Sequence, residues 1–303
     1  MTTYADRAAG CLVGLAVGDA IGTTVEFKPR GSFTLLTDMV GGGPFGLKPG
    51  QWTDDTSMAL CLAESLLEKG DIDERDQMER YVRWWKGGEN SSTGRCFDIG
   101  NATASALHKF MRDGNPIAGS KDPHSAGNGC LMRLAPVPIR YGKYSQIAQA
   151  TAFRTSSATT HGAQECLDAT VMFGHILADA MDETCKEGLL EGPDPMDYTG
   201  KLKRIAAGNY QDKTRDQIRG SGYVVDALEA ALWSFHTTDT FADAVLTAAN
   251  LGDDADTTAA ITGQLAGAFY GLEGIPAKWR ARIHDGARIE KLARDLADAA
   301  EGK

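Results

Sequence analysis

The sequence predicts an all-α fold, in which about ten or more helices pack around a large hydrophobic core. Apolar residues recur at steps of three and four through most of the 303 residues, which is the spacing of a buried helix face. Segments that alternate apolar and polar residues are missing, and no turn sequence joins two such segments into a hairpin. Hydrophobic residues make up 42 % of the chain, enough for a globular core.

The expected helices can be followed along the chain. The segment from Thr56 places apolar side chains at steps of three, four and one, as a core-facing helix does. A similar amphipathic pattern around Ile289–Ala299 predicts a helix that closes the fold. The other segments with this periodicity are Ala5–Val17, Arg75–Trp85, Ile99–Met111, Ser145–Thr155, Gln164–Met181, Tyr223–Phe235, Thr240–Ala249 and Thr257–Tyr270.

The segment Glu183–Gly222 is the weakest in helical pattern. It is rich in glycine, proline and charge, and only Met196–Ala207 within it has the spacing of a short helix. It could link two domains, but glycine-rich helix entries occur on both sides of it. We therefore interpret it as a long segment on the surface of one domain, and we expect residues 1–303 to form a single domain.

Composition and charge exclude several classes of protein. The chain has 41 acidic and 31 basic residues, a formal charge of −10, which repels phosphate backbones and argues against general nucleic-acid binding. No apolar stretch approaches the roughly 20 residues that span a bilayer, and the N-terminus does not resemble a signal peptide. The six cysteines are scattered, with no CxxC pair, as in a reducing compartment. We expect a cytoplasmic protein and a monomer.

Two acidic turns, Thr53–Asp55 (TDD) and Gly252–Thr258 (GDDADTT), each immediately precede an expected helix. Thr or Asp at such a place commonly caps the helix by accepting hydrogen bonds from its first N–H groups. One cap needs a single side-chain oxygen, whereas these turns contain two and three carboxylates. Such anions either diverge into solvent or converge on cations. Carboxylates and Thr hydroxyls suit Mg²⁺ or Mn²⁺ better than zinc or copper. The sequence therefore allows two interpretations of these turns, helix capping and a metal site.

Glycine-rich loops precede two other expected helix starts. AGNG at Ala126–Gly129 leads into an apolar segment, and GGGPFGLKPGQW at Gly41–Trp52 directly precedes the first acidic turn. The glycines either allow tight turns or leave backbone N–H groups bare for a phosphate. Neither loop contains the GKS or GKT sequence of a Walker loop, and neither has a GxGxxG sequence that follows a strand.

Taken together and in order, seven motifs resemble the ADP-ribosylglycohydrolase family, over nearly the whole chain. Each motif alone is weak, whereas their order and spacing are specific. They are GCLVGLAVGDAIGTTVEF (Gly10–Phe27), LKPGQWTDDTSMAL (Leu47–Leu60), DIGNAT (Asp98–Thr103), AGNGCLMR (Ala126–Arg133), TTHG (Thr159–Gly162), GYVVDAL (Gly222–Leu228) and GDDADTTAAITGQLAGAFYG (Gly252–Gly271).

The resemblance implies an all-α fold with a binuclear centre of two divalent cations, Mg²⁺ or Mn²⁺, at the base of a cleft. Motif matching assigns the metal ligands to both acidic turns. These ligands are Thr53, Asp54, Asp55, Asp254, Asp256 and Thr257. Members of the family often carry a glycine where this chain has Asp253, and the extra carboxylate either changes the ligand set or points outward.

The resemblance also implies catalytic and substrate-binding residues. Asp54 and Asp55 are expected to take part in activating water as well as in holding metal. Glu26 and Asp98 are the candidates for proton transfer, and the residues do not decide which is the essential acid or base. His161 is expected to contact ADP-ribose, and Tyr223 to pack against it unless it is a buried core residue. Four residues are expected to cradle the diphosphate: Ser125, Gly127, Asn128 and Gly129.

The expected function is hydrolysis of the bond between ADP-ribose and a modified protein side chain, with arginine as the first expectation and ADP-ribose as the product. The alternatives are another conjugate of ADP-ribose, linked to serine, to nucleic acid or to an O-acetyl group, and a catalytically silent ADP-ribose-binding relative. The same metal site suits any of the hydrolytic reactions, since specificity depends on what surrounds the leaving group. The intact acidic turns argue against the silent relative.

Overall fold

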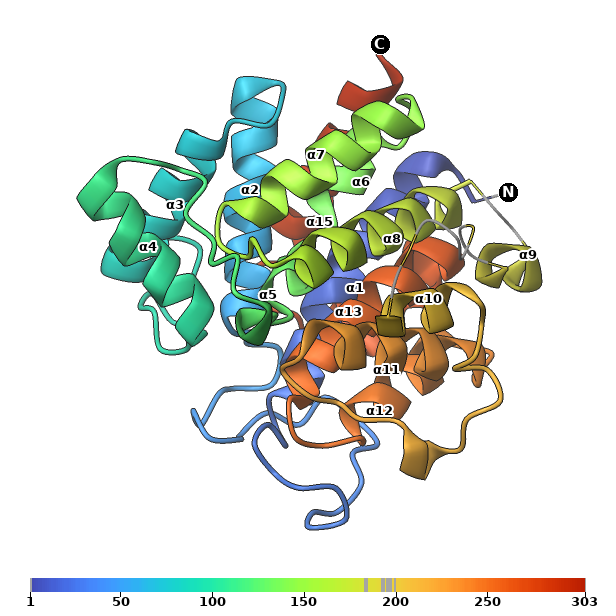
Figure 1. The fold of residues 1–303 in the computed structure, drawn as a ribbon. Coiled ribbons are helices and arrows are strands. Elements are labelled where there is room, and N and C mark those ends of the chain that lie inside the picture. The colour runs from blue at the N-terminus through green and yellow to red at the C-terminus, as the bar shows by residue number, and fades with distance from the viewer. Residues whose placement is uncertain (1, 183–184, 192–193, 195–197, 199, 303) are drawn as a thin grey trace.

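The described residues form fifteen α-helices joined by loops and short 3-10 turns, and they contain no β-strand (Figure 1). The structure is a computed structural model of the chain that describes residues 2–182, 185–191, 194, 198 and 200–302. The all-α prediction is confirmed. None of the helices in this part of the chain has the length and apolar character needed to cross a bilayer.

The helix bounds follow the periodicity of the sequence closely. The long helices are α1 (Tyr4–Gly22), α2 (Asp54–Lys69), α3 (Glu74–Gly87), α4 (Asn101–Asp113), α7 (Gln146–Ala158), α8 (Gln164–Ala180), α11 (Val224–His236), α12 (Phe241–Ala249), α13 (Ala255–Tyr270) and α15 (Gly286–Glu301). The short ones are α5 (Gly129–Met132), α6 (Pro136–Tyr141), α9 (Lys186–Leu190), α10 (Gly200–Ala206) and α14 (Ala277–Arg280). The expected helix Met196–Ala207 begins outside the described residues, and α10 covers its second half.

Helices α1 and α13 lie antiparallel and in close contact at the centre of the molecule (Figure 1). A Cβ atom added to Gly10 would lie 2.2 Å from the carbonyl oxygen of Gly267, and one added to Gly18 would lie 2.1 Å from that of Ala259. Glycine at every fourth position of α1 therefore lets the two backbones touch. This packing places the C-terminal end of α1 against the N-terminal end of α13, where the second acidic turn lies.

The helix α1 extends five residues beyond its predicted C-terminal end, from Val17 to Gly22. Gly18 and Gly22 interrupt the apolar pattern and look like helix breakers in the sequence. In the structure both face α13, where no side chain fits, so tertiary packing overrides their low helix propensity.

Helices α3 and α4 form a separate layer beside α2, at the left of Figure 1. Their buried side chains, among them Tyr81, Trp84, Leu107 and Phe110, make a second hydrophobic cluster apart from the main core. The loop that leads into α4 carries Asp98. Packing of this layer therefore fixes the position of Asp98 relative to α1, α2 and α13.

Candidate active site

The first acidic turn is anchored by Asp19, a fully buried acid in the last turn of α1. The backbone N–H of Thr53 and its hydroxyl each donate to Asp19 Oδ1 at 2.9 Å. The backbone N–H of Thr56 donates to Asp19 Oδ2 at 3.0 Å, and its hydroxyl donates at 2.6 Å. Asp19 thus satisfies N–H groups at the start of α2 from another helix. Thr53 makes no cap bond to its own helix, so simple capping is the wrong interpretation of this turn.

The two acidic turns meet. The Thr53 hydroxyl lies 3.4 Å from Asp256 Oδ2, although the two residues are 203 positions apart, and it lies equally far from Asp55 Oδ2. Asp254, at the N-terminal end of α13, makes no cap bond either. The packing of α1 on α13 and the bonds of Asp19 to α2 together bring both turns to one place. The carboxylates that converge there, called the acidic cluster below, are Asp19, Glu26, Asp54, Asp55, Asp98, Asp254 and Asp256.

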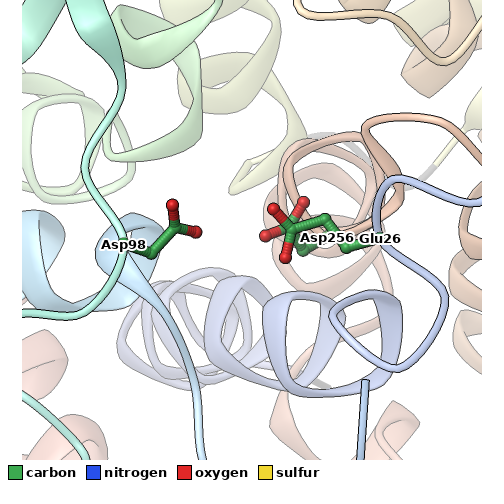
Figure 2. Close-up of side chains that lie close together, drawn as sticks. All are labelled: Glu26, Asp98 and Asp256. Atoms are coloured by element: carbon green, nitrogen blue, oxygen red, sulfur yellow. The ribbon is translucent and has the colours of Figure 1, made fainter. Parts of the chain in front are cut away.

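Glu26, Asp98 and Asp256 face one another across a small gap (Figure 2). One carboxylate oxygen from each lies within 4.8 Å of the others, a spacing at which three carboxylates could hold a metal ion. They come from three elements: the turn after α1, the loop before α4 and the first turn of α13. Glu26 also accepts a hydrogen bond from the hydroxyl of Thr23, at 3.4 Å.

Burial and mutual repulsion raise the pKa values of these acids. Burial, followed by the charge of Asp98, raises the pKa of Glu26 to about 8. Burial, followed by the charge of Asp19, raises the pKa of Asp98 to about 6. The pKa of Asp256 lies well above its ordinary value because the group is buried and faces Glu26. Simultaneous ionisation of all these carboxyls therefore requires positive charge close by.

The pKa values of the carboxyls in the first acidic turn are raised in the same way. Burial raises the pKa values of Asp54 and Asp55 well above their ordinary range, with the charges of Asp98 and Asp19 as the next largest causes. Within the described residues, no Lys or Arg forms an ion pair with the acidic cluster. Asp55 Oδ1 is buried and has no hydrogen-bond partner there. Uncompensated buried anions of this kind are suited to binding cations.

Five members of the acidic cluster form the floor of a cavity of about 580 Å³, namely Glu26, Asp54, Asp98, Asp254 and Asp256, whereas Asp19 and Asp55 do not line it. Besides the candidate catalytic acids Glu26, Asp54 and Asp98, its lining includes seven other predicted residues, namely Gly127, Asn128, Gly129, His161, Asp254, Asp256 and Thr257. A second cavity, of about 1380 Å³, adjoins the first and shares Gly127 and Gly222 with it. Ser125 and Tyr223 line this larger cavity. The predicted substrate-binding residues thus divide between two connected spaces.

The loop Ala126–Gly129 is fixed by its neighbours on both sides. The side-chain N–H of Asn128 donates to Asp254 Oδ2 at 2.6 Å, which ties this loop to the second acidic turn. A Cβ atom added to Gly129 would lie 2.6 Å from the ring of His161, so glycine is required for close approach. The other glycine-rich loop, Gly41–Trp52, lines neither of these two cavities, which favours its interpretation as a turn.

His161 is buried beneath this loop as a neutral side chain. Its Nδ1 lies 2.8 Å from the hydroxyl of Thr160. Burial, followed by the charge of Arg133, lowers its pKa to about 3. A neutral imidazole on the wall of an acidic cavity can contact a ligand without competing with cations for the carboxylates.

Tyr223 is half-buried at the wall of the larger cavity, so the alternative of a buried core residue is wrong. Its hydroxyl donates to Glu165 Oε2 at 2.6 Å, and the Lys201 ammonium lies 4.5 Å from its ring centroid. Ser125 donates its hydroxyl to the carbonyl oxygen of Asp122 at 2.7 Å. Both polar groups already have partners within the protein.

Asp253 is exposed, with φ at +55°, and it lines neither of the two cavities. A left-handed backbone favours glycine, which accounts for the glycine common in the family at this place. The extra carboxylate therefore points outward. Asp19, in contrast, is a residue that sequence reasoning missed, and its only signal was an acid within the apolar segment GLAVGDAIG.

Fold and site together define an all-helical protein with an acidic cavity. The sequence matches the ADP-ribosylglycohydrolase family over residues 1–303, and the chain belongs to this family of hydrolases. It is 49 % identical to the ADP-ribosylarginine hydrolase Tri1 of Serratia proteamaculans, over 96 % of this chain and 79 % of that protein. It is 33 % identical to the ADP-ribosyl-dinitrogen reductase glycohydrolase of Rhodospirillum rubrum, over 97 % of this chain and 95 % of that protein.

A solved structure described as an ADP-ribosylglycohydrolase-related protein complex has the same fold. Its TM-score to this chain is 0.89 at 41 % identity, covering 99 % of this chain and 100 % of that chain. The resemblance inferred from the seven motifs is confirmed, and the fold it implies is confirmed with it.

Proposed function

We propose that the protein hydrolyses the N-glycosidic bond between ADP-ribose and a modified arginine side chain of a protein. The observation that carries this proposal is the meeting of the two acidic turns beneath a cavity of about 580 Å³, with Thr53 and Asp256 3.4 Å apart. Similarity to two proteins named ADP-ribosylarginine hydrolase, at 49 and 48 % identity, supports arginine as the linkage. A space of this size accommodates a ribose and its leaving group.

We further propose that the acidic cluster holds two divalent cations, Mg²⁺ or Mn²⁺. The ligands would be Thr53, Asp54, Asp55, Asp254, Asp256 and Thr257. When bound, such cations attract ribose hydroxyls and make water more acidic. The carboxylates without counter-charge and the unpartnered Oδ1 of Asp55 support this proposal, and oxygen ligands suit hard cations.

The chain's own carboxylates supply the remaining chemistry. Cleavage breaks the bond from ribose C1 to the guanidine nitrogen, forms a bond from C1 to a water oxygen, and transfers a proton to the departing nitrogen. Positive charge develops on the ribose ring, and the acidic floor stabilises it. Asp54 and Asp55 accept the proton of the attacking water, while Glu26 and Asp98, which line the cavity together with Asp54, take part in the proton transfers.

The rest of the substrate would extend into the larger cavity. Gly127 lines both spaces, so a diphosphate held by Ser125, Gly127, Asn128 and Gly129 would connect a ribose over the acids with an adenosine near Tyr223. His161 would contact the ligand as a neutral group. This orientation directs the modified arginine away from the larger cavity.

We also propose that residues 1–303 form one domain that acts as a cytoplasmic monomer. Cys11, Cys61, Cys96, Cys130 and Cys166 are free thiols, as expected in a reducing compartment. The partner is an ADP-ribosylated protein, and the net charge of −10 makes nucleic acid an unfavourable general partner.

The test is incubation with ADP-ribose linked to an arginine peptide, a serine peptide and DNA, each with and without a chelator, followed by product analysis. We expect free ADP-ribose from the arginine peptide only when divalent cations are present. Release from serine or DNA instead would assign the protein to another linkage. No release from any conjugate, together with no change in melting temperature on adding Mn²⁺ and ADP-ribose, would indicate a catalytically silent relative.

A further inference from the structure

Phe27 is an exposed aromatic residue at the edge of the acidic cavity. It follows the catalytic candidate Glu26 directly, lines the same cavity, and leaves 64 % of its surface accessible. Its φ is +63°, in the left-handed region that bulky residues rarely occupy. Residues in such backbone conformations cluster at active sites and ligand-binding positions.

The backbone of Phe27 is held in place by the second acidic turn. Its N–H donates to the carbonyl oxygen of Asp253 at 2.7 Å, and the N–H of Asp253 donates to the carbonyl oxygen of Lys28 at 2.8 Å. Asp253 is itself in the left-handed region. Two unusual backbone conformations therefore support each other, and they hold the backbone of Phe27 beside the acids.

Phe27 belongs to a group of three rings that we call the aromatic ledge: Phe27, Phe45 and Phe97. The Phe27 and Phe45 ring centroids are 6.4 Å apart in an edge-to-face contact, and those of Phe45 and Phe97 are 5.1 Å apart. Phe27 follows Glu26 in the sequence, and Phe97 precedes Asp98. The ledge is therefore attached to both acids that are proposed to transfer protons, and it adjoins the place where the bond is cleaved.

The position of the ledge relative to the two cavities bears on which part of the substrate it would contact. Phe27 lines the acidic cavity but not the larger cavity, where the adenosine end of the substrate is proposed to lie. With ribose over the acids and adenosine in the larger cavity, the leaving group would face the part of the acidic cavity that Phe27 lines. We propose, on the basis of the proposed function, that the aromatic ledge, and Phe27 in particular, stacks on the guanidine group of the modified arginine and determines specificity for it.

The chemistry of the leaving group fits this surface. A guanidinium is planar, delocalised and weakly hydrated, and it stacks on aromatic faces while its N–H groups point sideways toward acceptors. The neighbouring carboxylates of Glu26 and Asp98 provide such acceptors. A serine hydroxyl has no flat cationic face to stack. The ledge therefore favours arginine over serine through contacts that ADP-ribose itself does not make.

The experiment compares Phe27→Ala, Phe27→Asn and Phe27→Trp with the wild type on an ADP-ribosylated arginine peptide. Both Ala and Asn remove the ring, and Asn tolerates the left-handed backbone, so a shared defect reports the ring and not the backbone. We expect both to lower kcat/KM about tenfold, and Trp to retain at least half of the activity. The inhibition constant of free ADP-ribose should change less than twofold, because ADP-ribose lacks the leaving group.

Leu35→Ala and Val40→Ala are matched controls, because both residues are exposed and apolar on the same long loop and neither lines the acidic cavity. They should leave kcat/KM unchanged. Unchanged kcat/KM in Phe27→Ala and Phe27→Asn would overturn the proposal, and so would an equal weakening of ADP-ribose inhibition or a defect in Phe27→Ala alone. If the wild type releases no ADP-ribose from the arginine peptide, the proposed function fails first, before any comparison of variants.

Discussion

Thr53 is bound to Asp19 through two hydrogen bonds to one carboxylate oxygen, from its backbone N–H and from its hydroxyl, both 2.9 Å long. Asp19 lies on α1, and the same helix packs its glycines against α13. One helix therefore positions both acidic turns, the first by hydrogen bonding and the second by backbone contact. The acidic cluster depends on α1 although most of its carboxylates lie on other elements.

Removing the carboxylate of Asp19 should destabilise the protein. Asp19→Ala leaves N–H and hydroxyl groups of Thr53 and Thr56 buried without acceptors, at a cost of about 1–3 kcal/mol for each unsatisfied group. The change also removes one buried anion, so we expect a net loss of about 3 kcal/mol in the free energy of unfolding. Denaturant unfolding measures it. Asp19→Asn keeps one acceptor oxygen and should lose less. Equal stability of Asp19→Ala and wild type would contradict the anchoring role.

Divalent cations should stabilise the protein by relieving repulsion within the acidic cluster. At 100 times the dissociation constant, a ligand of the native state contributes about 2.7 kcal/mol, which corresponds to a rise in melting temperature of roughly 5 °C or more. Asp55→Asn should abolish most of this rise in thermal unfolding with Mn²⁺ or Mg²⁺. It should also make the metal-free protein more stable, because one buried charge is removed.

The matched control for Asp55→Asn is Asp253→Asn, since Asp253 is an exposed acid in the second acidic turn and Asn tolerates its left-handed backbone. This variant should retain the full response to metal. A response that is lost equally in both variants would mean that the cations bind to the acidic surface and not to the buried cluster.

Asp54→Ala should abolish turnover without unfolding the protein. Asp54 lines the floor of the acidic cavity, and burial together with the charge of Asp98 holds its pKa well above the ordinary range. Loss of a group that positions or deprotonates the attacking water typically lowers kcat by about 10²–10⁴-fold. Product release from an arginine peptide and far-UV circular dichroism measure the two properties. Retained activity in a folded Asp54→Ala variant would refute the assignment.

Because α1 and α13 approach each other so closely, one methyl group added between them should strongly destabilise the protein. A Cβ atom at position 18 would lie 2.1 Å from a backbone oxygen of α13, and backbone cannot move aside as a flexible side chain can. Gly18→Ala should therefore cost about 3 kcal/mol in the free energy of unfolding, at the upper end for an overpacked core. Gly87→Ala is the matched control, because nothing lies within 4 Å of its added Cβ. Equal stability of the two variants would contradict the packing.

The sequence was sufficient to predict the helices and the acidic turns, and the reasons are physical. Helical periodicity is a local property, so Thr257–Tyr270 was predicted to within two residues of the start of α13. Clustered carboxylates at two helix starts indicated that the two acidic turns converge. The 3.4 Å contact of Thr53 with Asp256 shows that the turns do meet. The ligand roles of the individual residues stay predictions.

Other features could not be predicted because they depend on pairs distant in the sequence. Asp19 is one acid in an apolar helix, and nothing near it indicates that its partners begin 34 residues later. The left-handed backbone of Phe27 has no local signal either, since it is imposed by hydrogen bonds with the second acidic turn. The bond from Asn128 to Asp254 joins residues 126 positions apart in the same way.

His161 should make the protein less stable in acid. Its pKa is about 3 in the folded protein because the ring is buried, whereas in the unfolded chain the pKa is about 6.5. Between these values the unfolded state binds a proton that the folded state excludes, so stability falls as the pH falls below about 6.5. From pH 7 to pH 5 this single group accounts for a loss of about 2 kcal/mol.

His161→Gln removes the titrating group and keeps a polar side chain near Thr160. The carboxyls of the acidic cluster have raised pKa values and act in the opposite direction, but they are common to both proteins and drop out of the comparison. Denaturant unfolding at pH 7 and pH 5 should therefore show a smaller loss in His161→Gln than in the wild type, by about 2 kcal/mol. The same pH dependence in both proteins would mean that His161 is protonated in the folded state, and its assignment as a neutral ligand-contacting group would be wrong.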